Sequence, residues 1–332
     1  MIYANIWLIR NKTPRTLMKT LHSDTPLQTK MAALIQRLAP QEGHTRSLLD
    51  GVRLMRADRP LGRTPVLYEP SIVIVCQGHK RGYLADQIYR YDALHYLVLS
   101  VPLPFSTETD ASPEEPLLAV SVRLDMTAVA DLVIEVEQQA NRSVNAPLGI
   151  VSTPLDALLA DTTVRLLQAL TSPLEAKVLG PAIVRELSFR VLMGPQGGAI
   201  RAALAHQGNF ARISRVLRRI HHDYPQSLDV ELLADEAGLS IPAFHAHFKA
   251  VTATSPIQYI KSVRLHQARL LMIRDDLTAA AAGARVGYES ASQFNREFKR
   301  FFGRSPGEEA REMRSAFALM APTQLDAVTL AH

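Results

Sequence analysis

The sequence contains a single cysteine, Cys76, among its 332 residues. One thiol cannot form a disulfide within the chain, and it cannot supply the cysteine set of a structural zinc site. Scarce cysteine is typical of proteins that fold in a reducing compartment, so we expect a cytoplasmic protein. Cys76 ends an apolar segment, where a small buried side chain and a reactive sensor are the two interpretations.

Long apolar runs are lacking as well. No stretch is long enough to span a bilayer, so we expect no membrane partner. The apolar residues 6–9 are followed at once by Arg10, and the start of the chain lacks the basic region and longer apolar core of a signal peptide. We expect residues 1–24 to form an arm outside the domains, with Met18 and Met31 as alternative starts.

The charge is not extreme, but it is unevenly placed. The formal net charge is +5. Residues 211–320 hold 16 Lys and Arg against 12 Asp and Glu, and the rest of the chain holds 21 against 20. A basic excess confined to one region indicates nucleic-acid binding there. The length and the ordinary apolar content of 47% predict about two globular domains.

A short pattern occurs twice near the C-terminal end, 50 residues apart. The matching residues are Phe244, Phe248, Lys249, Ser255 and Pro256 in the first copy and Phe294, Phe298, Lys299, Ser305 and Pro306 in the second. Self-similarity of this kind indicates that one supersecondary unit is used twice.

Each copy is predicted to form a helix, a tight turn and a second helix. The N-terminal caps of these helices are predicted at Asp229, Ser240, Thr278 and Ser290, and the turns at Gly238 and Gly287. Ser290 and Gln293 also have the spacing of a capping box. The paired phenylalanines lie four residues apart on one helical face, which we expect to be buried. Gly283 is a small residue where two helices of a unit would cross.

The faces opposite the phenylalanines carry the candidate DNA-binding residues. Arginine reads guanine, asparagine reads adenine, and lysine and serine reach phosphates or bases. The second copy is therefore better equipped to read sequence than the first. A small helical bundle with a solvated basic face is the alternative. The candidates are Pro242, His245, Ala246 and Lys249 in the first copy and Ala291, Ser292, Gln293, Asn295, Arg296, Lys299 and Arg300 in the second.

Four segments of this region resemble the DNA-binding domain of the AraC/XylS family of bacterial transcription regulators. They are residues 233–240 (LADEAGLS), 264–271 (RLHQARLL), 286–288 (VGY) and 293–306 (QFNREFKRFFGRSP). The resemblance implies an all-α domain of two helix-turn-helix units, held by a long linker helix, that enter successive major grooves. Pro242 and Ala246 stand where family members usually carry base-reading side chains, which leaves His245 as the main reader of the first unit.

The front half changes from helical to strand periodicity. We expect a helix over residues 25–38, a polar break over 41–47, and helices again over 126–139, 153–169 and 175–193. Short strands with frequent turns predict a sandwich or barrel. The strand candidates are residues 66–68, 71–76, 82–84, 88–91, 95–101 and 117–124. The glycine-rich segment 194–198 is the clearest boundary signal, and we expect it to be flexible.

Three further segments resemble the N-terminal domain of one AraC-type subfamily. They are residues 63–71 (RTPVLYEPS), 77–83 (QGHKRGY) and 95–104 (HYLVLSVPLP). The resemblance implies an α+β protein whose N-terminal half is a cupin-like β-barrel with flanking helices that senses a signal and contacts a second copy. The expected domains are a sensor and dimerisation part over 25–195, a linker over 196–210, the DNA-binding part over 211–320 and a tail over 321–332.

The combined prediction is a sequence-specific transcription regulator of the AraC type. Its expected partners are double-stranded DNA, a small-molecule effector and a second copy, with RNA polymerase as a further candidate. A barrel of this size can hold one small molecule, although strand-face packing explains each tyrosine equally well. The candidate effector-binding residues are Tyr68, Cys76, Tyr83, Tyr89, Tyr91 and Tyr96.

A cupin-type enzyme with an attached DNA-targeting module is the alternative function. Metal-dependent cupins need a cluster of imidazole and carboxylate ligands, typically opened by two histidines one residue apart. Neither His79 nor His95 belongs to such a pair, and His245 and His247 would point apart on a helix. No nucleophile-elbow motif is present. We therefore expect no catalytic residues, no metal and no cofactor.

Overall fold

The N-terminal half is built on two antiparallel sheets that pack face to face. The computed structural model describes residues 26–85, 87–93, 95–137, 150–195, 197–204 and 208–318. Within these ranges the sheets have six strands in the order β1-β2-β9-β4-β7-β10 and four in the order β3-β8-β5-β6. The strands are β1 (Gly43–Arg46), β2 (Val52–Ala57), β3 (Leu61–Tyr68), β4 (Ser71–Gln77), β5 (His79–Leu84), β6 (Gln87–Asp92), β7 (His95–Leu99), β8 (Leu103–Asp110), β9 (Leu117–Arg123) and β10 (Ile150–Pro154).

The central strand β4 carries apolar side chains on both faces of the larger sheet, so this half has a core on each side. Ile72, Ile74 and Cys76 point to one face, and Val73 and Val75 point to the other. All five are buried. A continuous apolar strand is typical of a sheet covered on both sides, and here the four-stranded sheet covers one side and helices cover the other.

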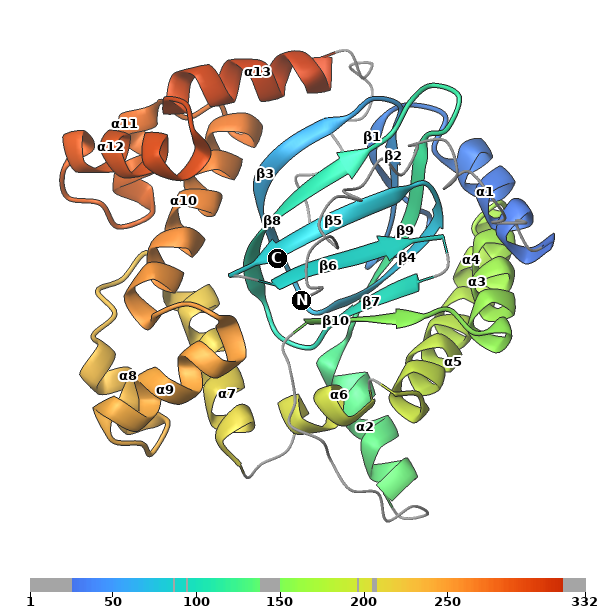
Figure 1. Cartoon of the computed structure of the whole chain (residues 1–332), viewed down its shortest axis with the longest axis horizontal. Coiled ribbons are helices and arrows are strands. Elements are labelled where there is room, and N and C mark those ends of the chain that lie inside the picture. Colours follow the sequence, from blue (N-terminus) through green and yellow to red (C-terminus); the bar gives the residue numbers. More distant parts are fainter. Residues whose placement is uncertain are drawn as a thin grey trace, which may run out of the picture.

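The helices pack against the outer face of the six-stranded sheet, on the right in Figure 1. Met31 and Ile35 of the first helix are buried there together with Leu166 and Leu187. The helices of this half are α1 (Pro26–Leu38), α2 (Met126–Glu137), α3 (Ala157–Ala169), α4 (Pro173–Val178) and α5 (Gly180–Met193). The predicted α+β fold with a cupin-like barrel and flanking helices is confirmed.

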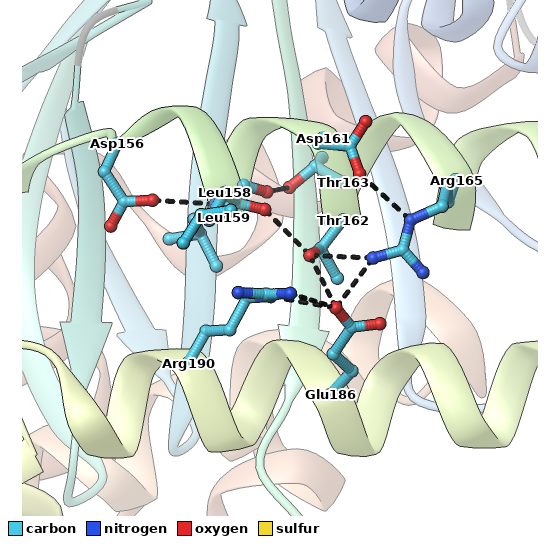
Figure 2. Close-up of polar contacts among 9 residues, drawn as sticks. All are labelled: Asp156, Leu158, Leu159, Asp161, Thr162, Thr163, Arg165, Glu186 and Arg190. Atoms are coloured by element: carbon cyan, nitrogen blue, oxygen red, sulfur yellow. Dashed lines mark hydrogen bonds and ion pairs between the residues drawn. The ribbon is translucent and has the colours of Figure 1, made fainter.

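A polar cluster joins α3 to α5 at their outer surface (Figure 2). Arg165 donates to Glu186 at 2.7 Å, and Arg190 Nε donates to the same carboxylate at 2.9 Å. The hydrogen bond from Arg165 is the largest of the influences that lower the pKa of Glu186 to about 2. The carboxylate therefore stays ionised and holds both arginines between the two helices.

Several predicted elements differ from the structure. The predicted helix over 153–169 begins as strand β10, and the helix itself starts after Asp156, whose carboxylate caps it. The predicted helix over 175–193 is two helices, α4 and α5, because Pro181 has no N–H to continue the first helix and suits the first turn of the second. Strand β1 falls in the predicted polar break, and β8 was not predicted because it contains Pro104 and several polar residues.

The segment between the two halves makes a tight turn. Gly194 N donates to Arg190 O at 2.9 Å, and Gly197 N donates to Gly194 O at 3.1 Å. A Cβ on Gly197 would lie 1.6 Å from Leu192 O, so only glycine fits. Helix α6 (Gly197–Leu204) follows directly. Hydrogen bonds thus join Gly194, at the end of α5, to Gly197, at the start of α6.

The C-terminal part is helical, as predicted. Its two helix-turn-helix units are α8–α9 and α11–α12, and the long helix α10 joins them (Figure 1). Asp229, Thr278 and Ser290 accept the predicted cap hydrogen bonds, whereas the Ser240 side chain makes none. The helices are α7 (Asn209–Asp223), α8 (Val230–Glu236), α9 (Ile241–Thr252), α10 (Pro256–Arg274), α11 (Ala279–Arg285), α12 (Ala291–Phe302) and α13 (Pro306–Ala318).

Helix α10 also lies against the barrel, beside β3 and β8. The Tyr259 hydroxyl donates to the Pro102 carbonyl at 2.7 Å, and Arg269 Nη1 donates to the Pro65 carbonyl at 3.4 Å. His221 Nε2 lies 2.8 Å from the same tyrosine oxygen. One helix therefore touches both helix-turn-helix units and the barrel. Among the described helices, none has the length and apolar content needed to cross a bilayer.

Candidate nucleic-acid interface

The second helices of the two units, α9 and α12, are built alike. In each helix two phenylalanines four residues apart are fully buried. The ring centroids of Phe244 and Phe248 are 5.5 Å apart at 58°, and those of Phe294 and Phe298 have the same spacing and angle. The prediction that these faces point inward is confirmed, and the opposite faces point to solvent.

Close packing of the first helix on the second sets the shape of the second unit. A Cβ on Gly283 would lie 2.9 Å from the Phe294 ring, so a larger residue would push α11 away from α12. The turn between these helices uses Gly287 at a φ of 88°, a backbone conformation that favours glycine. The predicted reasons for both glycines agree with these contacts.

Helix α12 presents a polar and basic face. All seven predicted contact residues of this unit are exposed: Ala291, Ser292, Gln293, Asn295, Arg296, Lys299 and Arg300. Asn295 and Arg296 make no hydrogen bond or ion pair with any described residue. Their donors and acceptors are therefore available to a partner outside the chain, even with the barrel in place.

Helix α9 exposes fewer polar side chains than α12. Pro242, Ala246 and Lys249 are exposed, and of these only lysine carries a polar side chain. His245 is half-buried, with its ring edge-on to Phe244 at a centroid distance of 6.3 Å. The neighbouring His247 accepts a hydrogen bond from Asn209 at 2.8 Å. The two units therefore share a scaffold but differ in the chemistry that they expose.

Arg264, in the middle of α10, links the segment that follows α7 to the second unit. Its guanidinium donates to the carbonyls of Tyr224 at 2.8 Å and Gln226 at 2.7 Å, which follow α7. It also donates to the carbonyl of Gly287 in the turn of the second unit, at 3.3 Å. One side chain thus ties the segment between α7 and α8 to the turn of the second unit. The sequence pattern contained Arg264 but gave no sign of this role, because its partners are carbonyls distant along the chain.

Comparison with known families decides the identity. A model described as "AraC-type transcriptional regulator N-terminus" matches residues 48–199, and one described as "Helix-turn-helix domain" matches residues 233–312. Together they span the barrel and both helix-turn-helix units. The chain belongs to the AraC/XylS family of transcription regulators.

Individual relatives match over about a third of the chain. The Msm operon regulatory protein of Streptococcus mutans is 30% identical over 105 residues, which is 32% of this chain and 38% of that protein. The transcriptional activator RclR of Escherichia coli is 31% identical over 103 residues, 31% of this chain and 36% of that protein. The chain thus spans less than two-fifths of the length of these relatives.

Solved structures match over most of the chain. An apo variant of ToxT from Vibrio cholerae has a TM-score of 0.53 at 10% identity, covering 82% of this chain and 99% of that one. Wild-type ToxT bound to an unsaturated fatty acid has a TM-score of 0.52 at 11% identity, covering 81% and 97%. At such low identity the likeness concerns the fold alone.

The predicted effector-binding residues of this AraC/XylS member do not surround one space. Tyr91 is buried between the sheets, where Tyr68 and Tyr89 pack against the same core. Cys76 and Tyr96 belong to the core on the helix side of the larger sheet. Burial raises the pKa of the Cys76 thiol, so it is held as a neutral core side chain.

The remaining tyrosine, Tyr83, points away from the barrel interior. Its neighbours on β5, Gly82 and Leu84, are the buried ones. Its ring lies under the Arg63 guanidinium at 4.2 Å, and its hydroxyl donates to Glu108 at 2.6 Å. Within the predicted set, only Tyr68, Tyr89 and Tyr91 share the interior.

The histidines considered as metal ligands lie in separate pairs. His79 lies 3.0 Å from Asp110, and His95 lies 2.7 Å from Asp92. Over the ranges that the structure describes, no three His, Cys, Asp or Glu side chains gather as a metal-ligand set.

Proposed function

We propose that the chain is a sequence-specific transcription regulator that reads DNA chiefly through α12. The observation that carries this is the exposed face of Asn295, Arg296 and Lys299 on a helix whose other face is locked by two buried phenylalanines. Arginine and asparagine on such a helix match guanine and adenine edges in the major groove. Selection of binding sites from random duplex DNA with the full chain tests it, since a regulator of this kind must enrich one sequence.

For the first unit we propose mainly phosphate and shape contacts. Lys249 can reach a phosphate, and Pro242 and Ala246 can pack closely against the groove without reading base edges. His245 remains the candidate base reader of α9. We keep residues 25–195 as the sensor part, 196–210 as the linker and 211–320 as the DNA-binding part, and the ranges matched by the two family models support these limits.

We further propose that the barrel interior takes a small-molecule effector. The Tyr91 hydroxyl is buried and has no hydrogen-bond partner among the described residues. A buried unpaired hydroxyl costs about 1–3 kcal/mol, which a ligand acceptor would relieve. Tyr68, whose ring meets Phe105 edge-on at 5.1 Å, would supply an apolar wall. ToxT with its bound fatty acid supports an effector with a polar group and an apolar body.

Calorimetry tests the effector. A ligand can shift the regulator only by its differential affinity for two states, and the coupling is reciprocal. A regulating ligand must therefore bind with different affinity with and without operator DNA, by about 5- to 150-fold. Equal affinities in the two titrations would leave the barrel without a regulatory role through that ligand.

The face of α4 and α5 is our proposed dimer contact. Leu174, Val178, Leu179 and Phe189 are exposed there. They lie near a groove of about 500 Å³ that Leu179 and Ile183 help to line. Apolar side chains gathered on one surface mark an interaction site, and a two-fold contact would place each copy's side chains in its partner's groove. Sedimentation equilibrium should give a dimer that Val178→Glu dissociates, and a monomeric wild-type chain would contradict this.

We also propose that the protein has no catalytic activity and acts in the cytoplasm. The curated relatives include transcriptional activators, which supports a regulator without catalytic activity and keeps RNA polymerase as a candidate partner. We place the protein in the cytoplasm, where its DNA target would be. Metal analysis of the purified chain tests the non-enzyme assignment, since stoichiometric metal would favour a cupin-type enzyme.

A further inference from the structure

We propose that Glu297 orients the side-chain amide of Gln293 so that α12 reads an adenine at one position of its site. Gln293 then determines specificity, and Glu297 is its positioning residue. This inference rests on the proposed DNA-binding function and adds the base to be recognised and the group that fixes the choice.

The Glu297 carboxylate is the centre of a polar network beneath the exposed face of α12. Its side chain is only 12% exposed. It accepts hydrogen bonds from Lys261 Nζ at 2.8 Å, from the Tyr288 hydroxyl at 2.9 Å and from Gln293 Nε2 at 3.3 Å. Lys261 belongs to the linker helix and Tyr288 to the turn before α12, so the carboxylate is held from two sides.

The charge of Glu297 decides which way the amide faces. Burial opposes ionisation, but hydrogen bonds from Lys261, Tyr288 and Gln293 together lower the pKa of Glu297. An ionised carboxylate only accepts hydrogen bonds. The amide nitrogen of Gln293 must therefore face Glu297, because a flipped amide would place its oxygen against the carboxylate.

The outward edge of Gln293 then has a fixed order of groups. One N–H is used by Glu297, which leaves the carbonyl oxygen and the second N–H on the edge that faces away. A glutamine reads adenine with this pair, accepting from N6 and donating to N7. Guanine offers only acceptors at O6 and N7, so its O6 would meet the glutamine oxygen.

The position of Gln293 in the helix suits this role. Its backbone N donates to the Ser290 cap at 3.3 Å, so it lies in the first turn of α12. The N-terminal residues of a recognition helix are the ones that reach base edges. Both the backbone and the side chain of Gln293 are thus fixed before DNA binds, and little side-chain freedom is lost on binding.

The test is a base-substitution series on the duplex that the full-length chain selects. Gln293→Ala identifies the position, because it should remove an adenine preference of about tenfold or more at that position. Glu297→Gln should reduce the adenine-to-guanine ratio there to about twofold, since a neutral amide accepts either orientation of Gln293. The preference that depends on Arg296 should stay unchanged in both variants.

Lys261→Gln and Tyr288→Phe are the matched controls. Each removes one partner of Glu297 but leaves its contact with Gln293, so both should lower the melting temperature and keep the adenine preference. If Glu297→Gln keeps the wild-type ratio, or if the controls lose it equally, the positioning role is wrong. A wild-type chain that selects no sequence at all would instead overturn the proposed function.

Base analogues test the two-point contact between Gln293 and adenine without altering Glu297, should that variant fail to fold. Replacing the adenine by purine removes N6, and replacing it by 7-deazaadenine removes N7. We expect wild-type binding to fall by about fivefold or more with each analogue. Binding that either analogue leaves unchanged would overturn the two-point contact.

Discussion

At the scale of single residues, Arg296 is the side chain on which sequence reading should depend most. It is exposed and makes no hydrogen bond or ion pair with the described part of the chain, so its removal should leave the fold intact. Arg296→Ala should cost about 1–3 kcal/mol on the preferred site and relax specificity at one base. A binding assay across single-base variants of the site measures this, and unchanged preference at every position would refute the assignment.

Lys299, on the same helix as Arg296, is expected to contact a phosphate and not a base. It is exposed in the last turn of α12, where a cation suits a phosphate better than a base edge. Lys299→Ala should weaken preferred and unrelated duplexes alike and reduce the salt slope by about one. A loss confined to the preferred sequence would show that Lys299 reads a base.

Two buried histidines make the DNA-binding part sensitive to acid. Burial lowers the pKa of His266 to about 3 and that of His221 to about 4, against an ordinary value of 6.5. The His266 ring lies edge-on to Phe301 and Phe302, 5.3 Å from each. Between pH 6.5 and about 4 the unfolded chain binds protons that the folded chain does not, so stability is lost as the pH falls.

Urea unfolding at a series of pH values measures this effect. With both histidines titrating only in the unfolded state, the free energy of unfolding of the DNA-binding part should fall by up to about 2.7 kcal/mol per pH unit below 6. His266→Leu should roughly halve the slope, whereas the exposed His222→Gln should not change it. A slope that is the same in wild type and His266→Leu would contradict the neutral buried state.

At the residue scale, the sequence predicted the features that depend on spacing within one element. The buried phenylalanine faces, three of the four caps and the reason for Gly283 all follow from local patterns. The roles of Arg264 and Glu297 did not, because all their partners except Gln293 lie on other elements, between 9 and 40 residues away. The tyrosines were misjudged as one set since strand alternation sends neighbours to opposite faces.

At the scale of elements, α10 is the part that holds the DNA-binding half together. Arg264 alone supplies hydrogen bonds to carbonyls in the segment that leads from α7 to the first helix-turn-helix unit and in the turn of the second unit. Arg264→Ala should destabilise this half by about 2–3 kcal/mol, because several carbonyls lose a charged donor at once. It should also weaken binding to the complete site more than binding to the part read by α12.

Thermal unfolding and footprinting measure the two effects separately. Arg311→Ala is a suitable control, since Arg311 is exposed and its side chain donates to the Gly307 carbonyl of its own helix. Equal protection of both parts of the site by Arg264→Ala would mean that the spacing of the units does not depend on this residue.

Element boundaries show where sequence patterns were insufficient. Helices with predicted caps and aromatic faces, such as α9 and α12, begin directly after the predicted cap residues Ser240 and Ser290. Strand β8 was missed because Pro104 and alternating polar residues do not look like a strand, yet it pairs with both β3 and β5. Its stability comes from those neighbours, which a local pattern does not reveal.

At the scale of the whole molecule, the contact between α10 and the barrel is the route by which an effector would act. The Tyr259 hydroxyl donates to the Pro102 carbonyl, which follows β7. The Tyr259 hydroxyl oxygen is also hydrogen-bonded to His221 Nε2. Tyr259→Phe should leave both halves folded but loosen their contact. With a barrel ligand identified, the ratio of its affinities with and without DNA should fall toward one, as calorimetry would show, and an unchanged ratio would place the coupling elsewhere.

We expect residues 208–318 to carry sequence-specific DNA binding without the barrel. The most direct measurement is a salt titration of this fragment and of the full chain on the selected duplex and on a scrambled one. We predict binding of the selected duplex about a thousandfold or more tighter than the scrambled duplex, with affinity falling linearly in log salt for both. A folded fragment that binds the two duplexes equally at every salt concentration would contradict the account.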